Sequence, residues 1–139
     1  MDLQIKDHVV LVSGGAKGIG AAIVRGLAKD GAIPIILDKD ANAANSVESE
    51  LRNSGCTSFT VIGDLTKTES CRAAVEQTLQ KFGRLDALVN NAGINDGVGL
   101  EKGSPQAFVE SLQRNLLHYY NLAHFALPAL KKAHGSIVN

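Results

Sequence analysis

A glycine-rich loop near the start of the chain has the clearest chemical use. Residues 13–20 read Ser-Gly-Gly-Ala-Lys-Gly-Ile-Gly, and they directly follow the apolar run 9–12. The residues behind the loop form a helical pattern with Ile19, Ile23 and Leu27 on one face. A strand, a glycine turn and a helix start bring free N–H groups and the positive end of the helix dipole to one point. Because glycines let the backbone approach an anion closely, the loop predicts a site for phosphate groups.

The spacing of the glycines separates this loop from two common phosphate-binding patterns. Gly14, Gly18 and Gly20 give G-x-x-x-G-x-G, whereas the usual dinucleotide fingerprint is G-x-G-x-x-G. Lys17 precedes Gly18, so the G-K-[ST] of nucleoside triphosphatases does not follow. For the glycine cluster alone, a tight turn without a ligand is the alternative. The strand before it and the helix after it favour the pyrophosphate of a dinucleotide.

Acidic residues follow the next two predicted strands. Asp38 ends the apolar run 33–37, about 20 residues after Gly18, where an acid would bond the adenosine ribose hydroxyls. Asp64 and Leu65 follow the predicted strand 58–62, and there we expect the carboxylate and the Leu65 backbone to contact adenine. Each acid has an alternative role, Asp38 as a helix N-cap and Asp64 as a turn former.

The fourth predicted strand, 87–90, ends in Asn90-Asn91-Ala92-Gly93. A strand-ending turn is the alternative role of the two asparagines. Ligands of open parallel sheets bind beyond the carboxyl ends of the strands, so we expect these four loops to hold one dinucleotide. The predicted cofactor-binding residues are Ser13, Gly14, Lys17, Gly18, Ile19, Gly20, Asp38, Asp64, Leu65, Asn91, Ala92 and Gly93.

The elements that position these loops alternate between strand and helix along the chain. We predict strands over 9–12, 33–37, 58–62, 87–90 and 136–139, and helices over 18–29, around 44–51, behind 66–69 and from 104 onward. Repeated strand–helix units with short apolar strands predict an α/β fold, a parallel sheet between two helix layers. The length of 139 residues fits one domain, residues 1–139.

Two helix starts and one helix face can be predicted in more detail. Thr66-Lys67-Thr68-Glu69 has the pattern of a capping box, and Ser104-Pro105 supplies an N-cap and a first helical residue to the longest helix. The predicted apolar stripe of that longest helix is Phe108, Leu112, Leu116, Tyr119, Ala123, Leu127 and Leu130.

Composition excludes several classes of partner. The 14 basic and 14 acidic residues give a net charge of 0, which argues against nucleic acid and anionic membranes. The chain has no secretion-signal pattern and no apolar run long enough to span a bilayer, so we expect a cytoplasmic protein. Cys56 and Cys71 are expected to be free thiols, and neither cysteine nor histidine spacing indicates a metal site.

These motifs together resemble the short-chain dehydrogenase/reductase family. The matching residues are Ser13-Gly14-x-x-x-Gly18-Ile19-Gly20, Asp38, Asp64-Leu65-Thr66, Gly83-Arg84-Leu85-Asp86, Asn90-Asn91-Ala92-Gly93 and Asn115. The family usually has threonine where this chain has Ser13. The resemblance implies a Rossmann-type doubly wound fold and hydride transfer between a nicotinamide cofactor and an alcohol or carbonyl substrate. It also implies that Asn115 holds a water in the proton relay. The alternative is that its side chain bonds a helix carbonyl and only shapes a bend. A homodimer or homotetramer is implied as well.

The family's catalytic serine and Y-x-x-x-K helix have no counterpart here. Tyr119 and Tyr120 are followed four residues later by Ala123 and His124 rather than lysine. We therefore expect an N-terminal half, with a sheet that is incomplete after its fifth strand and no activity on its own. The alternatives are a non-catalytic NAD-binding module and a sugar-nucleotide epimerase of the extended type. A sugar, a polyol or a hydroxysteroid is the substrate class that the resemblance suggests.

The choice between the two nicotinamide cofactors depends on charges near the ribose. The Asp38 carboxylate would repel a 2′-phosphate, whereas Lys17 and Lys39 could reach one. Because the acid occupies the position expected for the ribose contact, NAD is favoured over NADP.

Overall fold

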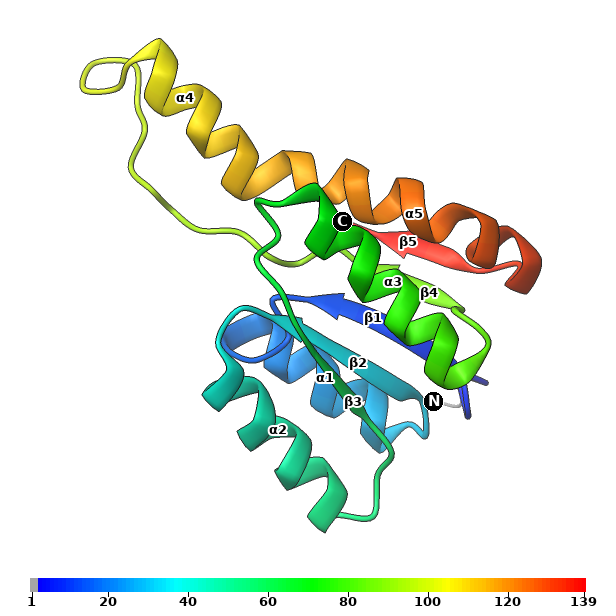
Figure 1. The fold of residues 1–139 in the computed structure, drawn as a ribbon. Helices are drawn as coiled ribbons and strands as arrows, with labels where there is room; N and C mark the ends of the chain where they lie inside the picture. Colours follow the sequence, from blue (N-terminus) through cyan, green and yellow to red (C-terminus); the bar gives the residue numbers. More distant parts are fainter. Residues whose placement is uncertain (1–2) are drawn as a thin grey trace.

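The computed structural model describes residues 3–139 as a five-stranded parallel sheet with helices on both faces (Figure 1). The strands are β1 (Val9–Ser13), β2 (Ile33–Asp38), β3 (Phe59–Ile62), β4 (Ala87–Val89) and β5 (Ser136–Val138). The helices are α1 (Gly18–Lys29), α2 (Ala41–Asn53), α3 (Thr68–Phe82), α4 (Pro105–Leu112), the π-helical turn η1 (Gln113–Leu117) and α5 (His118–Ala133). The spatial strand order is β3-β2-β1-β4-β5. The predicted α/β fold is confirmed, and the strand bounds differ from the predicted ones by one residue.

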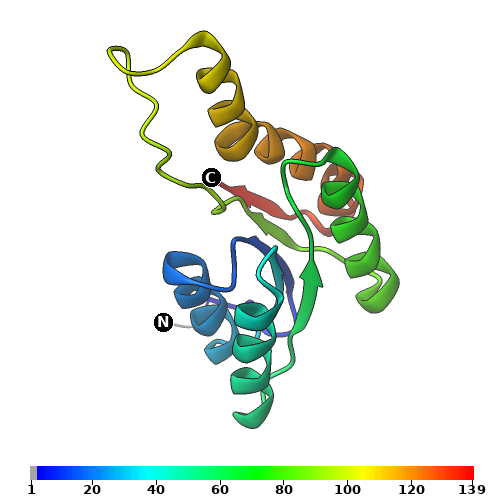
Figure 2. The same ribbon diagram turned by 60° about the vertical axis from the view of Figure 1, so that its left-hand side comes forward.

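The sheet separates two apolar clusters. Helices α1 and α2 cover one face and α3 and α5 the other, as Figures 1 and 2 show together. Val10 and Val12 of β1 face the α1/α2 side, while Val9 and Leu11 of the same strand face the α3/α5 side. This alternation leaves all four side chains at most 4% exposed. A sheet covered on both faces explains why its strands read as continuous apolar runs.

The register aligns the carboxyl ends of the strands. Ser13 pairs with Leu37, and Val12 pairs with Val89 across the β1–β4 ladder. Val89 in turn pairs with Val138 of β5. Because all ladders are parallel, the loops that leave β1, β2, β3 and β4 emerge at one edge of the sheet.

The apolar face of α1 is only partly buried. Ile19 is 75% exposed, whereas Ile23 and Leu27 are partly buried and pack against the cluster on the α1/α2 side. The buried positions are Gly20, Ala21, Val24 and Ala28. Small residues let the helix start lie directly against the glycine loop, and this close approach sets which face turns inward.

The predicted stripe of the longest helix is wrong for most of its length, although Leu130 is buried as expected. Phe108, Leu116 and Leu127 are between 44% and 56% exposed. The residues of α5 that turn inward are His118, Leu122, Ala126 and Leu130. The π-helical turn η1 shifts the helical phase, and α4 before it has no buried residue. An uninterrupted α-helical period therefore assigns the wrong face.

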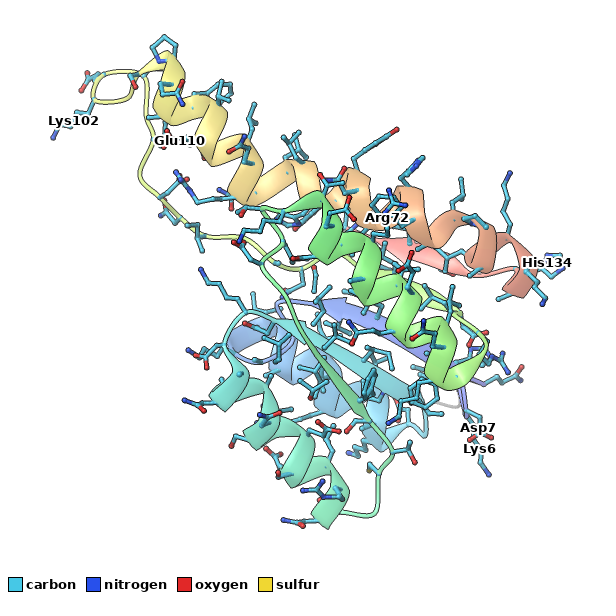
Figure 3. The ribbon with its side chains drawn as sticks, viewed as in Figure 1. Lys6, Asp7, Arg72, Lys102, Glu110 and His134 are labelled. Carbon is cyan, nitrogen blue, oxygen red and sulfur yellow. The ribbon has the colours of Figure 1, made fainter. Side chains whose placement is uncertain are left out.

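Helix α4 and the extended segment before it project beyond the sheet (Figures 1 and 2). We call residues 94–112 the arm. Figure 3 shows Lys102 and Glu110 on the arm, at the opposite end of the molecule from Lys6 and Asp7. The predicted N-cap is confirmed, because Ser104 Oγ accepts from the Ala107 N–H at 3.1 Å.

The predicted capping box at residues 66–69 is not formed. The N-cap of α3 is Lys67, and its side chain makes no capping hydrogen bond. The Thr66 hydroxyl instead donates to Asp64 Oδ1 at 2.7 Å, so the preceding loop uses the side chain that the motif assigned to the helix.

Candidate functional site

A cavity of about 540 Å³ lies at the carboxyl ends of the strands. Its wall comes from all four strand-end loops and from the helix that follows the arm. All of the predicted cofactor residues except Ser13 line it. The lining residues that were not among them are Lys39, Asp40, Gly63, Thr66, Ile94, Arg114 and His118. The structure therefore brings the four separate loops to one concave site.

The glycine loop presents an uncapped helix start to this cavity. Lys17, the N-cap of α1, supplies no side-chain acceptor, and the first turn has no acidic residue. The orphan N–H groups of a helix start favour an anion. Gly18 has φ +52°, and no protein atom lies within 4 Å of the position that a Cβ would take there. The space beside these N–H groups is therefore open. The residues present thus fit a phosphate group.

Ser13 supports the cavity from behind. Its buried hydroxyl accepts from the N–H groups of Asn91 and Ala92, both at 3.0 Å. Asn91 Nδ2 donates back to the carbonyls of Ser13 at 3.0 Å and Gly14 at 3.3 Å. These bonds fasten the β4 loop to the glycine loop. Direct contact of Ser13 with a cofactor remains a prediction.

Asp38 organises the loop after β2. Its carboxylate accepts from the N–H of Ala16 at 3.1 Å and from the N–H of Asp40 at 3.0 Å. It is not the helix N-cap, because Asp40 caps α2 through the Ala43 N–H. Each carboxylate oxygen has a second lone pair, so Asp38 keeps acceptor capacity towards a ligand in the cavity.

Lys17 is paired within the protein. Its ammonium forms an ion pair with Asp40. The hydrogen bond from Lys17 lowers the pKa of Asp40, and the same bond raises the pKa of the lysine. Lys17 and Lys39 were the two lysines considered for contact with a 2′-phosphate. Of these, Lys17 is already paired with an acid of the protein.

Asp64 lies where it can serve both of its predicted roles, the contact with adenine and the turn. It lines the cavity, and its Oδ1 accepts from the Thr66 N–H at 3.1 Å as well as from the Thr66 hydroxyl. The hydrogen bond from that hydroxyl is the main cause that lowers the pKa of Asp64. The carboxylate is therefore ionised at neutral pH and acts as a pure acceptor.

Asn115 lies in the π-helical turn and reaches the β4 loop. Its Oδ1 accepts from the Ile94 N–H at 2.6 Å, and its Nδ2 donates to Ser111 Oγ at 3.4 Å. The side chain does not bond a helix carbonyl, contrary to the alternative role considered for it. It is partly buried and is not itself part of the cavity wall. Its role in a proton relay remains a prediction.

His118 is the buried member of the wall. It is 1% exposed, and its Nε2 lies 2.9 Å from the Arg114 carbonyl oxygen. A carbonyl only accepts, so this nitrogen carries the hydrogen. Burial lowers the pKa of His118, which keeps the ring neutral at pH 7. The spacing of the histidines in the sequence did not indicate this position in the cavity wall.

A stripe of polar residues on this helix could have indicated which of its faces turns towards the cavity. Ser111, Arg114, Asn115 and His118 follow the i, i+3, i+4, i+7 spacing of one helix face. This polar face turns towards the β4 loop and the cavity, whereas the apolar stripe predicted that a different face of the helix turns inward. Residues 3–139 contain no cluster of three or more side chains suited to a metal, and none of their helices could cross a membrane.

Comparison with known proteins defines the family. Residues 8–139 match the short chain dehydrogenase family, and the chain belongs to it. Members of this family are oxidoreductases that use NAD or NADP. The strand order and the Rossmann-like sheet agree with this assignment.

Individual relatives are similar along nearly all of this chain. L-fucose dehydrogenase of Bos taurus is 43% identical over 140 residues, which are 100% of this chain and 50% of that protein. 11-beta-hydroxysteroid dehydrogenase A of Sesamum indicum is 35% identical over 97% of this chain and 39% of its own length. The crystal structure of Cj0485 dehydrogenase matches with a TM-score of 0.88 at 37% identity, covering 99% of this chain and 52% of that one. The chain spans about half the length of these relatives.

Proposed function

We propose that this chain is the cofactor-binding part of an oxidoreductase that moves a hydride between NAD(H) and an alcohol or carbonyl substrate. The observation that supports it most is the single cavity that gathers the ends of β1, β2, β3 and β4. Residues 1–139 form the dinucleotide-binding domain in this proposal. The relatives named for sugar oxidation favour a sugar as the substrate.

The parts of the dinucleotide match separate groups of the wall. The uncapped start of α1 and the open space at Gly18 suit the pyrophosphate. Asp38 would accept from the adenosine ribose hydroxyls, and Asp64 from the adenine amino group. The segment 91–94 would then lie beside the nicotinamide half. When bound, the nicotinamide supplies the hydride acceptor or donor, and these protein groups hold and orient it.

The charges favour NAD over NADP. A 2′-phosphate would meet the Asp38 carboxylate, and the ion pair with Asp40 reduces the pull of Lys17 on such a phosphate. Lys39 also lines the cavity, yet its single charge is opposed by the two neighbouring acids. The proposed preference therefore depends on Asp38.

Proton transfer in this proposal requires groups from the other half of the protein. Tyr119 and Tyr120 lie on α5 with Ala123 and His124, rather than a lysine, one turn later. Asn115 is the relay residue that this chain would contribute, held by its bond from Ile94. We also propose that the whole protein is a homodimer or homotetramer.

The test uses the full-length protein. NADH and NADPH are titrated by protein fluorescence, and NAD reduction is then followed with L-fucose, D-galactose and a hydroxysteroid. Tighter binding of NADH than of NADPH is expected, and failure to bind either nucleotide would sink the proposal. Asp38→Asn should weaken NADH about tenfold, since hydrogen bonds to a charged group contribute about 1.5–3 kcal/mol. An equal loss for NADPH would contradict the ribose role of Asp38.

A further inference from the structure

The segment after β4 is fixed although it has no regular structure. Residues 90–99 form neither helix nor strand, yet their backbone and side chains are tied to the polar stripe of the following helix. One tie is the bond from the Ile94 N–H to Asn115. The other is Asp96, whose carboxylate lies opposite Arg114 and Ser111.

Asp96 receives three hydrogen bonds. Ser111 Oγ donates to Oδ1 at 3.0 Å, and Arg114 Nε and Nη2 donate to Oδ2 at 3.1 and 3.0 Å. The Asp96 side chain is 16% exposed and that of Arg114 34%. The ion pair is therefore partly buried and well oriented, unlike the loose surface pairs that contribute little. Burial opposes ionisation of Asp96, but the bonds from Arg114 and Ser111 outweigh it and lower the pKa of this carboxyl.

The position of this pair connects it to the cavity. Arg114 lines the cavity, and Ile94, two residues before Asp96, lines it as well. Arg114 and Asn115 are adjacent in the π-helical turn, so the two ties share one rigid element. Loss of the Asp96 tie would leave Ile94 and the arm held to that turn mainly by the side chain of Asn115.

We propose that Asp96 and Arg114 are positioning residues of the cavity, which hold the segment 93–96 against the π-helical turn and thereby fix Ile94 and Asn115 for the bound nicotinamide half. This rests on the proposed function for the identity of the ligand. Neither residue needs to react or to contact the transferred hydride. The ion pair instead restricts the cavity wall before the ligand arrives, which lowers the ordering cost of binding.

An electrostatic role and a positioning role of this ion pair predict different effects on NADH affinity. In a purely electrostatic role, Asp96→Asn would leave Arg114 opposed only by Glu110 at 3.8 Å and would tighten binding of the anionic NADH, whereas Arg114→Gln would weaken it. In a positioning role, either change releases the same tie. Both variants should then weaken NADH, by about three- to tenfold, and the double variant should be no weaker than the weaker single one.

The experiment measures NADH affinity of the full-length protein and its Asp96→Asn, Arg114→Gln and double variants. Amide hydrogen exchange at Ile94 is followed in the same samples, and we expect it to be about three- to tenfold faster in each variant. Arg25→Gln and Glu50→Gln serve as matched controls, because that pair is also joined by two arginine hydrogen bonds, both at 2.8 Å, and connects α1 to α2 away from the cavity. The controls should change neither reading.

The outcomes separate the two proposals. Opposite shifts in NADH affinity, additive losses, or unchanged exchange at Ile94 would overturn the positioning role while NADH binding by the unaltered protein stands. If the unaltered protein binds no NADH, the proposed function fails, and the exchange at Ile94 still decides whether the ion pair holds this segment.

Discussion

Replacement of Gly20 by alanine tests how the glycine loop is built. A Cβ at this position would lie 2.6 Å from Asn91 Nδ2 and closer still to the Gly14 carbonyl oxygen. Favourable non-bonded contacts of carbon begin near 3.5 Å, so the helix start must move away from the loop. Overpacking of this kind costs about 1–3 kcal/mol, and loss of one Asn91 bond adds about 1 kcal/mol. We expect the free energy of unfolding to fall by about 2–4 kcal/mol.

The assay is urea unfolding of the full-length protein, combined with NADH titration. A displaced loop should weaken NADH about tenfold or more, which corresponds to about 1.4 kcal/mol. Gly26→Ala is the matched control in the same helix, because a Cβ at that exposed site meets no atom within 4 Å. It should stabilise the protein by about 0.5–1 kcal/mol, since alanine is the better helix former. If Gly20→Ala behaves like Gly26→Ala, the close approach of α1 to the loop is refuted.

Three other predictions concern cysteine reactivity, acid stability and the Ser13–Asn91 connection. Burial raises the pKa of Cys71 to about 11. In the folded protein at pH 8, iodoacetamide should therefore modify Cys56 and spare Cys71, as measured by peptide mass spectrometry. Equal modification of the two cysteines would contradict the buried position of Cys71. Burial opposes ionisation of Asp86, but bonds from Arg84 and from the Val9 N–H outweigh it and lower its pKa below the unfolded value of about 3.9. The stabilisation by ionised Asp86 is therefore complete above that value and is lost as pH falls through the folded pKa. The urea concentration at the unfolding midpoint should decrease at pH values below 4, and it should decrease less in Asp86→Asn. Parallel pH curves for the two proteins would exclude Asp86 as a cause. Ser13→Ala leaves two loop N–H groups without their acceptor and should cost about 1–3 kcal/mol in unfolding free energy, whereas Ser13→Thr should retain most of it.

Local patterns were sufficient for the sheet and most of the site. The apolar runs, the glycine turn and the acids after the strands are determined by short stretches of sequence, and parallel strand–helix repeats force their carboxyl ends to one edge. This is why Gly14, Asp38, Asp64 and Ala92 could be assigned to a common site before their distances were known. The caps at Ser104 and Gly83 are equally local.

Other features depended on neighbours that are distant in the sequence. The inner face of α1 follows from the contact of the helix start with Gly14 and Asn91. The capping motif is a different case, because Thr66 bonds Asp64 only two residues earlier. At that motif, a local turn competed successfully with a local helix cap.

The sequence by itself determined an α/β chain of the short-chain dehydrogenase family with loops suited to a dinucleotide, because strand period, glycine spacing and turn chemistry act over a few residues. Only the tertiary structure decided which face of the long helix meets the cavity. Across the π-helical turn, the buried face of α5 is shifted by one residue from the apolar spacing, and Arg114 and His118 line the cavity. That choice depends on Asp96 and Ile94, some 20 residues earlier, whose bonds satisfy the polar stripe only when the chain is folded.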